Sequence, residues 1–260
     1  MKKIRLDCLL VEKGLVESRE KAKALVMEGN VFVNEIKAKK SGTFIDPAAS
    51  VKILQKMPYV SRGGLKLDAA LNNFNIDVHG KVAMDVGAST GGFTDCLLQH
   101  GAKKVYAIDV GYGQLSWELR NNPDVIVLEK TNIRYLDEVL RNQEIGVRGH
   151  RLEDLIKKNI DIATIDVSFI SLHKVIPKII EFLKKEGEII ALIKPQFEVG
   201  KKDVCKGGVV KDEAKRLEAI KKISSEAHSM GLEVKGIIQS PLTGPKGNRE
   251  YFIYLARGKK

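Results

Sequence analysis

Short apolar runs alternate with amphipathic segments along the chain from residue 82 onward. Runs rich in valine and isoleucine predict strands buried on both faces, and segments with apolar residues at helical spacing predict helices between them. Strands that alternate with helices predict an α/β fold on a mostly parallel, Rossmann-like sheet, and the Gly- and Pro-rich connection before the last run predicts an antiparallel strand at the carboxyl end. The predicted strands are 82–86, 105–110, 125–128, 160–167, 187–193, 232–240 and 251–255.

The helices predicted between these strands are less regular. Ser61 is a typical N-cap for one helix, and Lys66 is placed just off the apolar face of that helix. Pro177 is an awkward interior residue of another, because proline lacks the N–H that a helix needs. The apolar face predicted for the first helix is Leu65, Ala69 and Leu71. The other predicted helices are 93–100, 134–158 with an interruption near Gly146 and Gly149, 172–183, and 213–230 after a loop at 197–210.

The amino-terminal part of the chain has a pattern of its own. Apolar residues at helical spacing stop at Gly14, and Ser18 is a typical N-cap for a second helix. Two short apolar runs, 31–34 and 51–54, predict strands on either side of a Lys-rich turn. Pro58 then interrupts any periodic element. The predicted organisation is a small α+β domain at 1–58, a linker at 59–62 and the large domain at 63–260.

A glycine-rich turn follows the first strand of the large domain. It begins at Gly87, and the next strand ends in Asp109. Glycines let a ligand approach the backbone more closely than a Cβ permits, and the amides at the start of the following helix are free to bind it. An acidic residue at the end of the next strand suits the two hydroxyls of a ribose. The spacing differs from the G-x-G-x-x-G of dinucleotide dehydrogenases. The alternative is a turn that serves only packing.

Two further charged residues, Asp166 and Lys194, end apolar strands. In an open parallel sheet, ligands bind beyond the carboxyl ends of the strands, which is where Asp109, Asp166 and Lys194 are expected. A charge at the end of a buried strand is costly without a partner. A structural Asp–Lys pair and a catalytic role therefore explain these two residues equally well. Lys66 and Glu250 lie outside this pattern.

Composition and charge narrow the class of protein. A chain of 260 residues can hold one large and one small domain, and its formal net charge of +11 favours a polyanionic partner such as nucleic acid. No apolar run approaches the ~18 residues of a membrane span and no signal-peptide pattern is present, so a cytoplasmic protein is expected. The three cysteines have no C-x-x-C spacing and the five histidines belong to no motif. Neither a disulfide framework nor a metal site is predicted.

The small domain carries the patterns R-x-D-x-x-L, G-x-x-x-S-R-x-x-A and G-x-V-x-V-N, and it resembles the S-four RNA-binding domain. That family docks its two-helix face on folded RNA, so the resemblance implies phosphate contacts from Arg5, Arg19 and Lys23. Without the resemblance, the basic charge is equally typical of a solvated face. The matching residues are Arg5, Asp7, Gly14, Ser18, Arg19, Ala22, Gly29, Val31, Val33 and Asn34.

The large domain resembles methyltransferases that use S-adenosylmethionine (SAM). Its D-x-G-x-x-x-G-G turn is similar to their motif I. With Y-V-S-R-G-G-x-K-L, I-D-V-S-F-I-S-L, L-I-K-P-Q-F-E and K-G-N-R-E-Y, the chain resembles the TlyA, or hemolysin-A, family of rRNA cytidine-2′-O-methyltransferases with an FtsJ-like domain. The resemblance implies a catalytic tetrad of Lys66, Asp166, Lys194 and Glu250. It implies SAM contacts from Asp85, Gly87, Ala88, Ser89, Thr90, Gly91, Gly92, Phe93, Asp109, Asn132 and Asp166, and a further RNA contact from Arg62.

The implied reaction is methyl transfer from SAM to a cytidine 2′-hydroxyl in ribosomal RNA of the large subunit, with the small subunit as a second candidate. The methyl group of SAM is already activated, so the protein mainly aligns the reactants and assists loss of the hydroxyl proton. Lys194 is the expected general base or alkoxide stabiliser, and Asp166 and Glu250 would hold the lysines. The short termini resemble family members with a single target, and a monomer is expected. The alternatives are a membrane-active hemolysin and a non-enzymatic RNA-binding protein on a methyltransferase fold.

Overall fold

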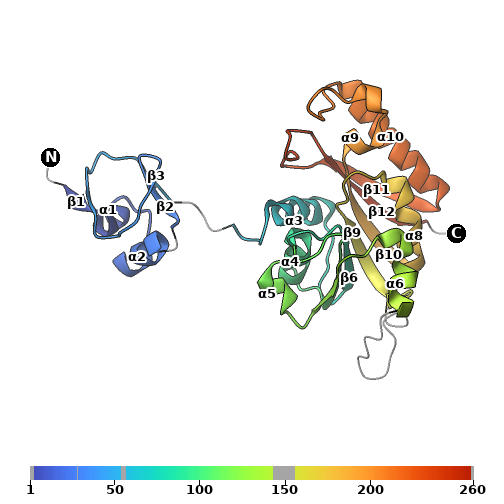
Figure 1. The fold of residues 1–260 in the computed structure, drawn as a ribbon, viewed down its shortest axis with the longest axis horizontal. Helices are drawn as coiled ribbons and strands as arrows, with labels where there is room; N and C mark the ends of the chain where they lie inside the picture. Colours follow the sequence, from blue (N-terminus) through green and yellow to red (C-terminus); the bar gives the residue numbers. More distant parts are fainter. Residues whose placement is uncertain (1–2, 28, 54–56, 143–155, 259–260) are drawn as a thin grey trace. The chain divides into compact units, whose positions relative to one another are not determined.

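The computed structural model describes residues 3–27, 29–53, 57–142 and 156–258. The chain divides into two compact units, Met1–Met57 and Pro58–Lys260 (Figure 1). Residues 59–62, which the sequence interpretation assigns to a linker, belong to the second unit. Tyr59 packs into the core of that unit and is 9% exposed.

The first unit packs two helices against small antiparallel sheets. Its core is formed by apolar residues of both helices and of the central strand: Leu6, Leu10, Ala22, Val26 and Val31. The sequence pattern did not predict three of the strands, because elements of two residues are too short to show an alternation. The elements are β1 (Ile4–Arg5), α1 (Leu6–Glu12), α2 (Arg19–Met27), β2 (Val31–Val33), β3 (Ile36–Lys37), β4 (Phe44–Ile45) and β5 (Val51–Ile53). The sheets have the orders β1-β4 and β3-β2-β5.

The second unit is built on a seven-stranded sheet of order β11-β12-β10-β9-β6-β7-β8. Strands β10, β9, β6, β7 and β8 are parallel, whereas β12 runs antiparallel to both β10 and β11. The predicted α/β class and the antiparallel strand at the carboxyl end are confirmed. The strands are β6 (Val82–Val86), β7 (Lys104–Ile108), β8 (Val125–Leu128), β9 (Ile160–Ile165), β10 (Leu183–Ile193), β11 (Leu232–Gln239) and β12 (Tyr251–Arg257).

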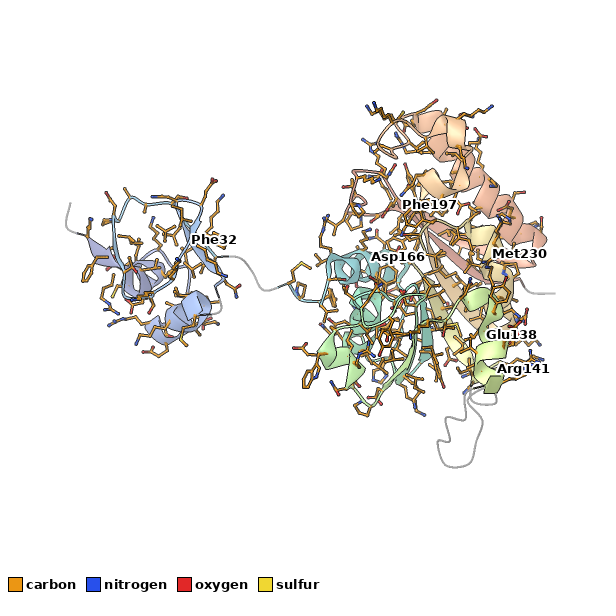
Figure 2. All side chains as sticks on the ribbon, in the orientation of Figure 1. Phe32, Glu138, Arg141, Asp166, Phe197 and Met230 are labelled. Carbon is orange, nitrogen blue, oxygen red and sulfur yellow. The ribbon has the colours of Figure 1, made fainter. Side chains whose placement is uncertain are left out.

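Helices cover both faces of this sheet (Figure 1). One face carries α3 (Arg62–Phe74), α4 (Gly92–Gln99) and α5 (Trp117–Arg120). The other carries α6 (Leu136–Asn142), α8 (Ile176–Phe182) and α10 (Glu213–Ser229). The remaining helical turns are η1 (Ile133–Tyr135), η2 (Leu172–Lys174), α9 (Pro195–Glu198) and η3 (Lys201–Asp203). The last two lie in or beside the segment 197–210, which was predicted as a loop. Figure 2 shows how the side chains fill the space between the layers.

Three helix predictions are corrected. Pro177 lies in the first turn of α8, where a missing N–H breaks no intrahelical bond. The helix predicted at 134–158 is replaced by η1 and α6 up to residue 142, and the predicted interruption at Gly146 and Gly149 lies outside the described residues. A third correction concerns α3: of the predicted face Leu71 is buried and Leu65 packs against the core, but the buried side also includes Lys66, Leu67 and Ala70. Pattern reasoning treats a lysine as exposed, but Lys66 is buried because it has an acidic partner.

Asp85 on β6 is a buried acid that joins three elements. Its carboxylate accepts hydrogen bonds from Thr94 Oγ1 on α4 (2.7 Å) and from Thr164 Oγ1 on β9 (3.1 Å). Burial raises the pKa of Asp85 to about 7, although the two threonine hydroxyls favour the charged form. In the unfolded chain an aspartate titrates near pH ~4. Between these values the folded state holds a proton that the unfolded state has lost, so stability falls as pH rises through this window.

Asp85→Asn is therefore expected to flatten the pH dependence of the free energy of unfolding, because the amide cannot ionise. The check is denaturant unfolding of both proteins near pH ~5 and near pH ~8. Wild type should lose stability between the two conditions, and the variant should lose much less. Equal slopes would contradict a protonated Asp85 in the fold.

Candidate active site

The carboxyl ends of four neighbouring parallel strands meet at one edge of the sheet. Gly87, Asp109, Asp166 and Lys194 each follow one of β6, β7, β9 and β10. Two cavities open there, one of about 870 Å³ and one of about 340 Å³. Their walls share Gly87, Ser89 and Asp166. The site is thus divided into a larger and a smaller chamber that meet at the glycine turn.

The glycine turn is shaped by close packing against the loop after β9. Gly87 has φ +89°, and a Cβ placed on it would lie 2.6 Å from the carbonyl oxygen of Asp166. Only glycine fits such a contact without displacing the backbone of the neighbouring loop. Gly91 has φ +97°, and a Cβ there would meet Leu119 of α5 at 2.3 Å. Gly87 therefore serves the cavities, whereas Gly91 allows α4 and α5 to pack.

Asp109 is fixed at the rim of the larger cavity by backbone amides. Its Oδ2 accepts the N–H of Ser89 at 2.8 Å, and its Oδ1 accepts the N–H of Gly111 at 2.7 Å. Each carboxylate oxygen can accept more than one hydrogen bond, so capacity remains for the hydroxyls of a ribose. The apolar Ile108, Val110 and Ile133 line the same cavity. Polar groups at one side and apolar groups around them fit a nucleoside such as that of SAM.

The predicted cofactor residues divide between the two cavities. The larger cavity is lined by Gly87, Ser89, Asp109, Asn132 and Asp166. The smaller is lined by Gly87, Ala88, Ser89, Thr90, Gly92, Phe93 and Asp166. Asp85 and Gly91 line neither: Asp85 lies beneath the turn with no exposed surface, and Gly91 faces α5. Their positions give them a structural part in shaping the turn.

The four residues of the predicted tetrad form two ion pairs. Lys66 Nζ lies 2.6 Å from Glu250 Oε2, and both side chains are buried, with 10% and 1% exposed. Lys194 Nζ lies 2.7 Å from Asp166 Oδ1, and its well-aligned hydrogen bond goes to Ser168 Oγ at 2.9 Å. One member of each pair, Lys66 and Asp166, lines the smaller cavity. Each pair therefore contributes one residue to the wall of the chamber that adjoins the nucleoside-shaped cavity.

Sequence reasoning missed residues in the loop after β9. Phe169 is 90% exposed, has φ +63°, and its ring lies 5.0 Å from that of Phe197. Both rings line the larger cavity, and Figure 2 labels Phe197 beside Asp166 at this edge of the sheet. A positive φ at an aromatic residue is uncommon and marks a constrained loop. Phe169 lies within the I-D-V-S-F-I-S-L motif that supports the family resemblance, but the motif by itself gives this residue no role.

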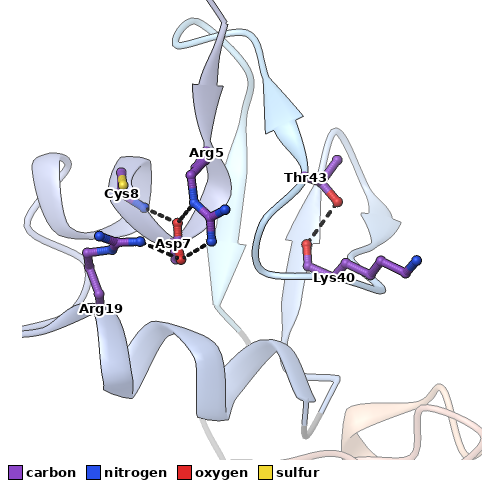
Figure 3. A network of polar contacts seen from close by, with 6 residues as sticks. All are labelled: Arg5, Asp7, Cys8, Arg19, Lys40 and Thr43. Atoms are coloured by element: carbon purple, nitrogen blue, oxygen red, sulfur yellow. Dashed lines mark hydrogen bonds and ion pairs between the residues drawn. The ribbon is translucent and has the colours of Figure 1, made fainter.

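The predicted RNA contacts in the first unit are not equivalent. Arg5 donates to both carboxylate oxygens of Asp7, at 3.0 and 2.8 Å, and Arg19 donates to the same carboxylate at 3.2 Å (Figure 3). Asp7 is fully buried, and the hydrogen bonds from Arg5 hold its pKa well below the ordinary range. Lys23 is exposed on α2, and Arg62 is exposed beside the smaller cavity of the second unit. Arg5 and Arg19 thus stabilise the fold of the first unit whether or not they contact RNA.

One group of possible metal ligands escaped the sequence analysis. Asp68, Cys96 and His100 bring one ligand atom each within 4.8 Å of one another. Asp68 and His100 already bond each other, with Oδ1 and Nε2 2.9 Å apart. Burial raises the pKa of the Cys96 thiol to about 12, which disfavours the thiolate that binds metals. The group is explained as a polar network between α3 and α4.

Comparisons with known proteins agree with this architecture. The FtsJ-like methyltransferase family matches residues 59–257, and the S4 domain matches residues 4–51. The Bacillus subtilis protein YqxC, described provisionally as an rRNA methyltransferase, is 44% identical over 98% of this chain and 86% of its own length. The Mycobacterium tuberculosis 16S/23S rRNA (cytidine-2′-O)-methyltransferase TlyA is 41% identical over 98% of this chain and 90% of its own length.

A solved structure from Streptococcus thermophilus, described provisionally as a hemolysin, is 39% identical and has a TM-score of 0.70 over 100% of this chain and 90% of that chain. Within the part of the chain that the structure describes, no helix is long and apolar enough to cross a membrane. The family match covers residues 59–257, nearly all of the second unit, with its glycine turn and both ion pairs. The chain belongs to the FtsJ-like methyltransferase family and carries an S4 domain before its methyltransferase domain.

Proposed function

We propose that this enzyme transfers a methyl group from SAM to the 2′-hydroxyl of a cytidine in ribosomal RNA, in the cytoplasm. The observation that carries the proposal is the pair of Lys–acid contacts, Lys66–Glu250 and Lys194–Asp166, beside a cavity that adjoins the one holding Asp109. SAM fits the larger cavity, and the ribose to be methylated fits the smaller one. The substrate is the one that the Mycobacterium tuberculosis relative is named for.

The residues divide the chemical work. SAM, when bound, supplies an activated methyl group. Lys194 accepts the hydroxyl proton as a neutral amine, or stabilises the alkoxide as an ammonium, and in either state Asp166 holds its Nζ at 2.7 Å. Lys66, paired with Glu250, adds a second positive charge at the wall of the smaller cavity. Gly87 packs closely against the Asp166 backbone, and both residues line both cavities. The two cavities therefore adjoin, which orients the reactants toward each other.

The first prediction concerns the cofactor. Asp109→Ala is expected to weaken SAM binding by about 1.5–3 kcal/mol, because hydrogen bonds to a charged acceptor are lost. The change also frees the amides of Ser89 and Gly111, so Asp109→Asn, which keeps acceptor and shape, is the matched control and should lose less. Isothermal titration with SAM measures both. Unchanged affinity in Asp109→Ala would remove the ribose contact from this account, and a wild type that does not bind SAM would favour a non-enzymatic or membrane-active protein.

A second prediction concerns RNA binding. Lys23→Ala is expected to raise the RNA dissociation constant and to reduce the slope of log K against log salt by about 0.7–0.9, the value for one lost phosphate contact. SAM affinity should stay level. Lys23 is preferred to Arg5 or Arg19 because removing either arginine would also leave the buried Asp7 carboxylate short of partners. An unchanged slope in Lys23→Ala would mean that the first unit contacts RNA through another surface.

A further inference from the structure

Two loops carry the residues of the Lys194–Asp166 pair, and a series of contacts joins them. One loop continues from β9 through Asp166 to η2, and the other continues from β10 through Lys194 into α9. The ion pair joins the loops at the strand ends. Three residues further along each loop, the rings of Phe169 and Phe197 contact each other. Glu198 makes a further contact between the two loops. Its Oε1 accepts the N–H of Leu172 at 2.9 Å, and its Oε2 accepts a hydrogen bond from Ser171 Oγ.

Glu198 is placed where a charge is costly. Its residue is only 5% exposed, and burial raises the pKa of its carboxyl, against the hydrogen bonds from Ser171 and Leu172. Other polar groups surround the Glu198 carboxyl. The ring of His173 lies 2.8 Å from Ser171 Oγ, and of two charged residues on α10, Lys222 lowers the pKa of Glu198 and Glu226 raises it. An apolar side chain could fill this position without the cost of burying a charge. The carboxylate is therefore explained by its hydrogen bonds to Ser171 and Leu172, which fix the position of Glu198.

That geometry leads directly to Lys194. Lys194 is the N-cap residue of α9, a helix of four residues that ends at Glu198, so the two residues are joined by a single turn. The turn is closed by the N–H groups of Phe197 and Val199, which donate to Lys194 O at 2.8 Å and to Pro195 O at 3.0 Å. Lys222 Nζ also donates to the Glu198 carbonyl at 3.1 Å, which anchors the turn to α10. Fixing Glu198 on Ser171 and Leu172 therefore fixes the backbone from which the Lys194 side chain extends.

We infer that Glu198 is a positioning residue for methyl transfer: it holds the Lys194 turn in register with the Asp166 loop, so that the Lys194 ammonium stays paired with Asp166, which lines both cavities. The inference rests on the proposed function, because it assigns Glu198 to the support of Lys194. Misplacing a reacting group by about 1 Å costs on the order of 10²-fold in rate. A loss of this size in turnover, with little change in binding, is the expected signature.

The test compares three single variants of the full-length protein, with Lys194→Ala beside them, below their melting temperatures. Glu198→Ala should lower kcat by about 10²-fold while SAM affinity and KM for RNA change by less than about threefold. Glu198→Gln should retain most of the activity, because its amide oxygen still accepts from Leu172 and the Ser171 hydroxyl can rotate to accept from its NH₂ group. Glu188→Ala is the matched control. Glu188 lies on β10, the strand that leads into Lys194, but away from the site, where its carboxylate pairs with Lys81 at 2.6 Å and with Tyr254.

The outcomes separate the inference from the proposed function. Loss of thermal stability in both alanine variants, with kcat lost only in Glu198→Ala and recovered in Glu198→Gln, supports the positioning role. If Glu198→Ala turns over at the wild-type rate while Lys194→Ala is inactive, the inference fails and the function stands. If Glu198→Ala and Glu188→Ala lose kcat equally, Glu198 is merely structural and the inference also fails. If wild type transfers no methyl group to RNA, the proposed function itself fails.

Discussion

Lys194→Ala is expected to lower the rate of methyl transfer by about 10²–10⁴-fold, the contribution of a well-placed proton-transfer group. SAM affinity should change little, because the work of Lys194 is done in the transition state. The side chain is 12% exposed and is held between Asp166 and Ser168. A transfer assay with tritiated SAM, run beside isothermal titration and thermal melts, measures rate, binding and fold on one preparation. Glu250→Ala, which removes only a partner of Lys66, should keep more activity.

The alternative of a purely structural pair predicts a different result. If the pair is purely structural, Lys194→Ala and Asp166→Ala would both lower the melting temperature by leaving a charge uncompensated. Activity would then fall only in proportion to the loss of folded protein. Lys184→Ala is the matched control, since Lys184 pairs with Asp161 at 2.7 Å on the same two strands away from the site. A Lys194→Ala protein that is folded, binds SAM and methylates at the wild-type rate would contradict the catalytic role.

Gly87→Ala is expected to abolish measurable SAM binding. The new Cβ would lie 2.6 Å from the Asp166 carbonyl oxygen, and a φ of +89° adds a backbone cost of roughly 1–2 kcal/mol for any other residue. Relief of the contact must move either the turn that holds Ser89 against Asp109 or the loop that carries Asp166. Both cavities would change shape, so binding and turnover should be lost together. Isothermal titration with SAM and a thermal melt are the measurements.

Gly80→Ala separates the backbone cost of a positive φ from the effect of the close contact with Asp166. Gly80 also has a positive φ, +69°, but a Cβ there meets no atom within 4 Å. It should lose stability through the backbone cost alone and keep SAM affinity. If both variants bind SAM like wild type, close packing at Gly87 has no role in the cofactor site.

The position of the site could be predicted from the sequence because parallel strands place their carboxyl ends at one edge. Asp109, Asp166 and Lys194 were found by that rule and Gly87 by the glycine-rich turn, and the structure brings them together. Lys66 and Glu250 could not be found in this way. They are 184 positions apart, and no spacing relates α3 to the connection between β11 and β12. Only the resemblance to a family pointed to them.

Burial of charged residues is where pattern reasoning failed. A periodic pattern counts Lys66, Asp85 and Glu198 as polar and therefore exposed, yet all three are buried with specific partners. Each pairing depends on the tertiary structure, since the partners lie on other elements. The same limit explains why Glu198 was included in a predicted loop and why Asp85 was predicted to contact the cofactor. Its position next to the glycine turn in sequence does not give it access to the cavity.

The most direct test of the central claim is to incubate the purified protein with ribosomal RNA and labelled SAM, digest the RNA to nucleosides, and identify the methylated product by mass spectrometry. The same analysis of ribosomal RNA from cells with and without the gene locates the nucleotide. The proposed function predicts 2′-O-methylcytidine at a defined site of large-subunit RNA, with or without a second site in the small subunit, lost with the gene and with Lys194→Ala. A methyl group on a base, on another class of RNA, or on no RNA at all would contradict it.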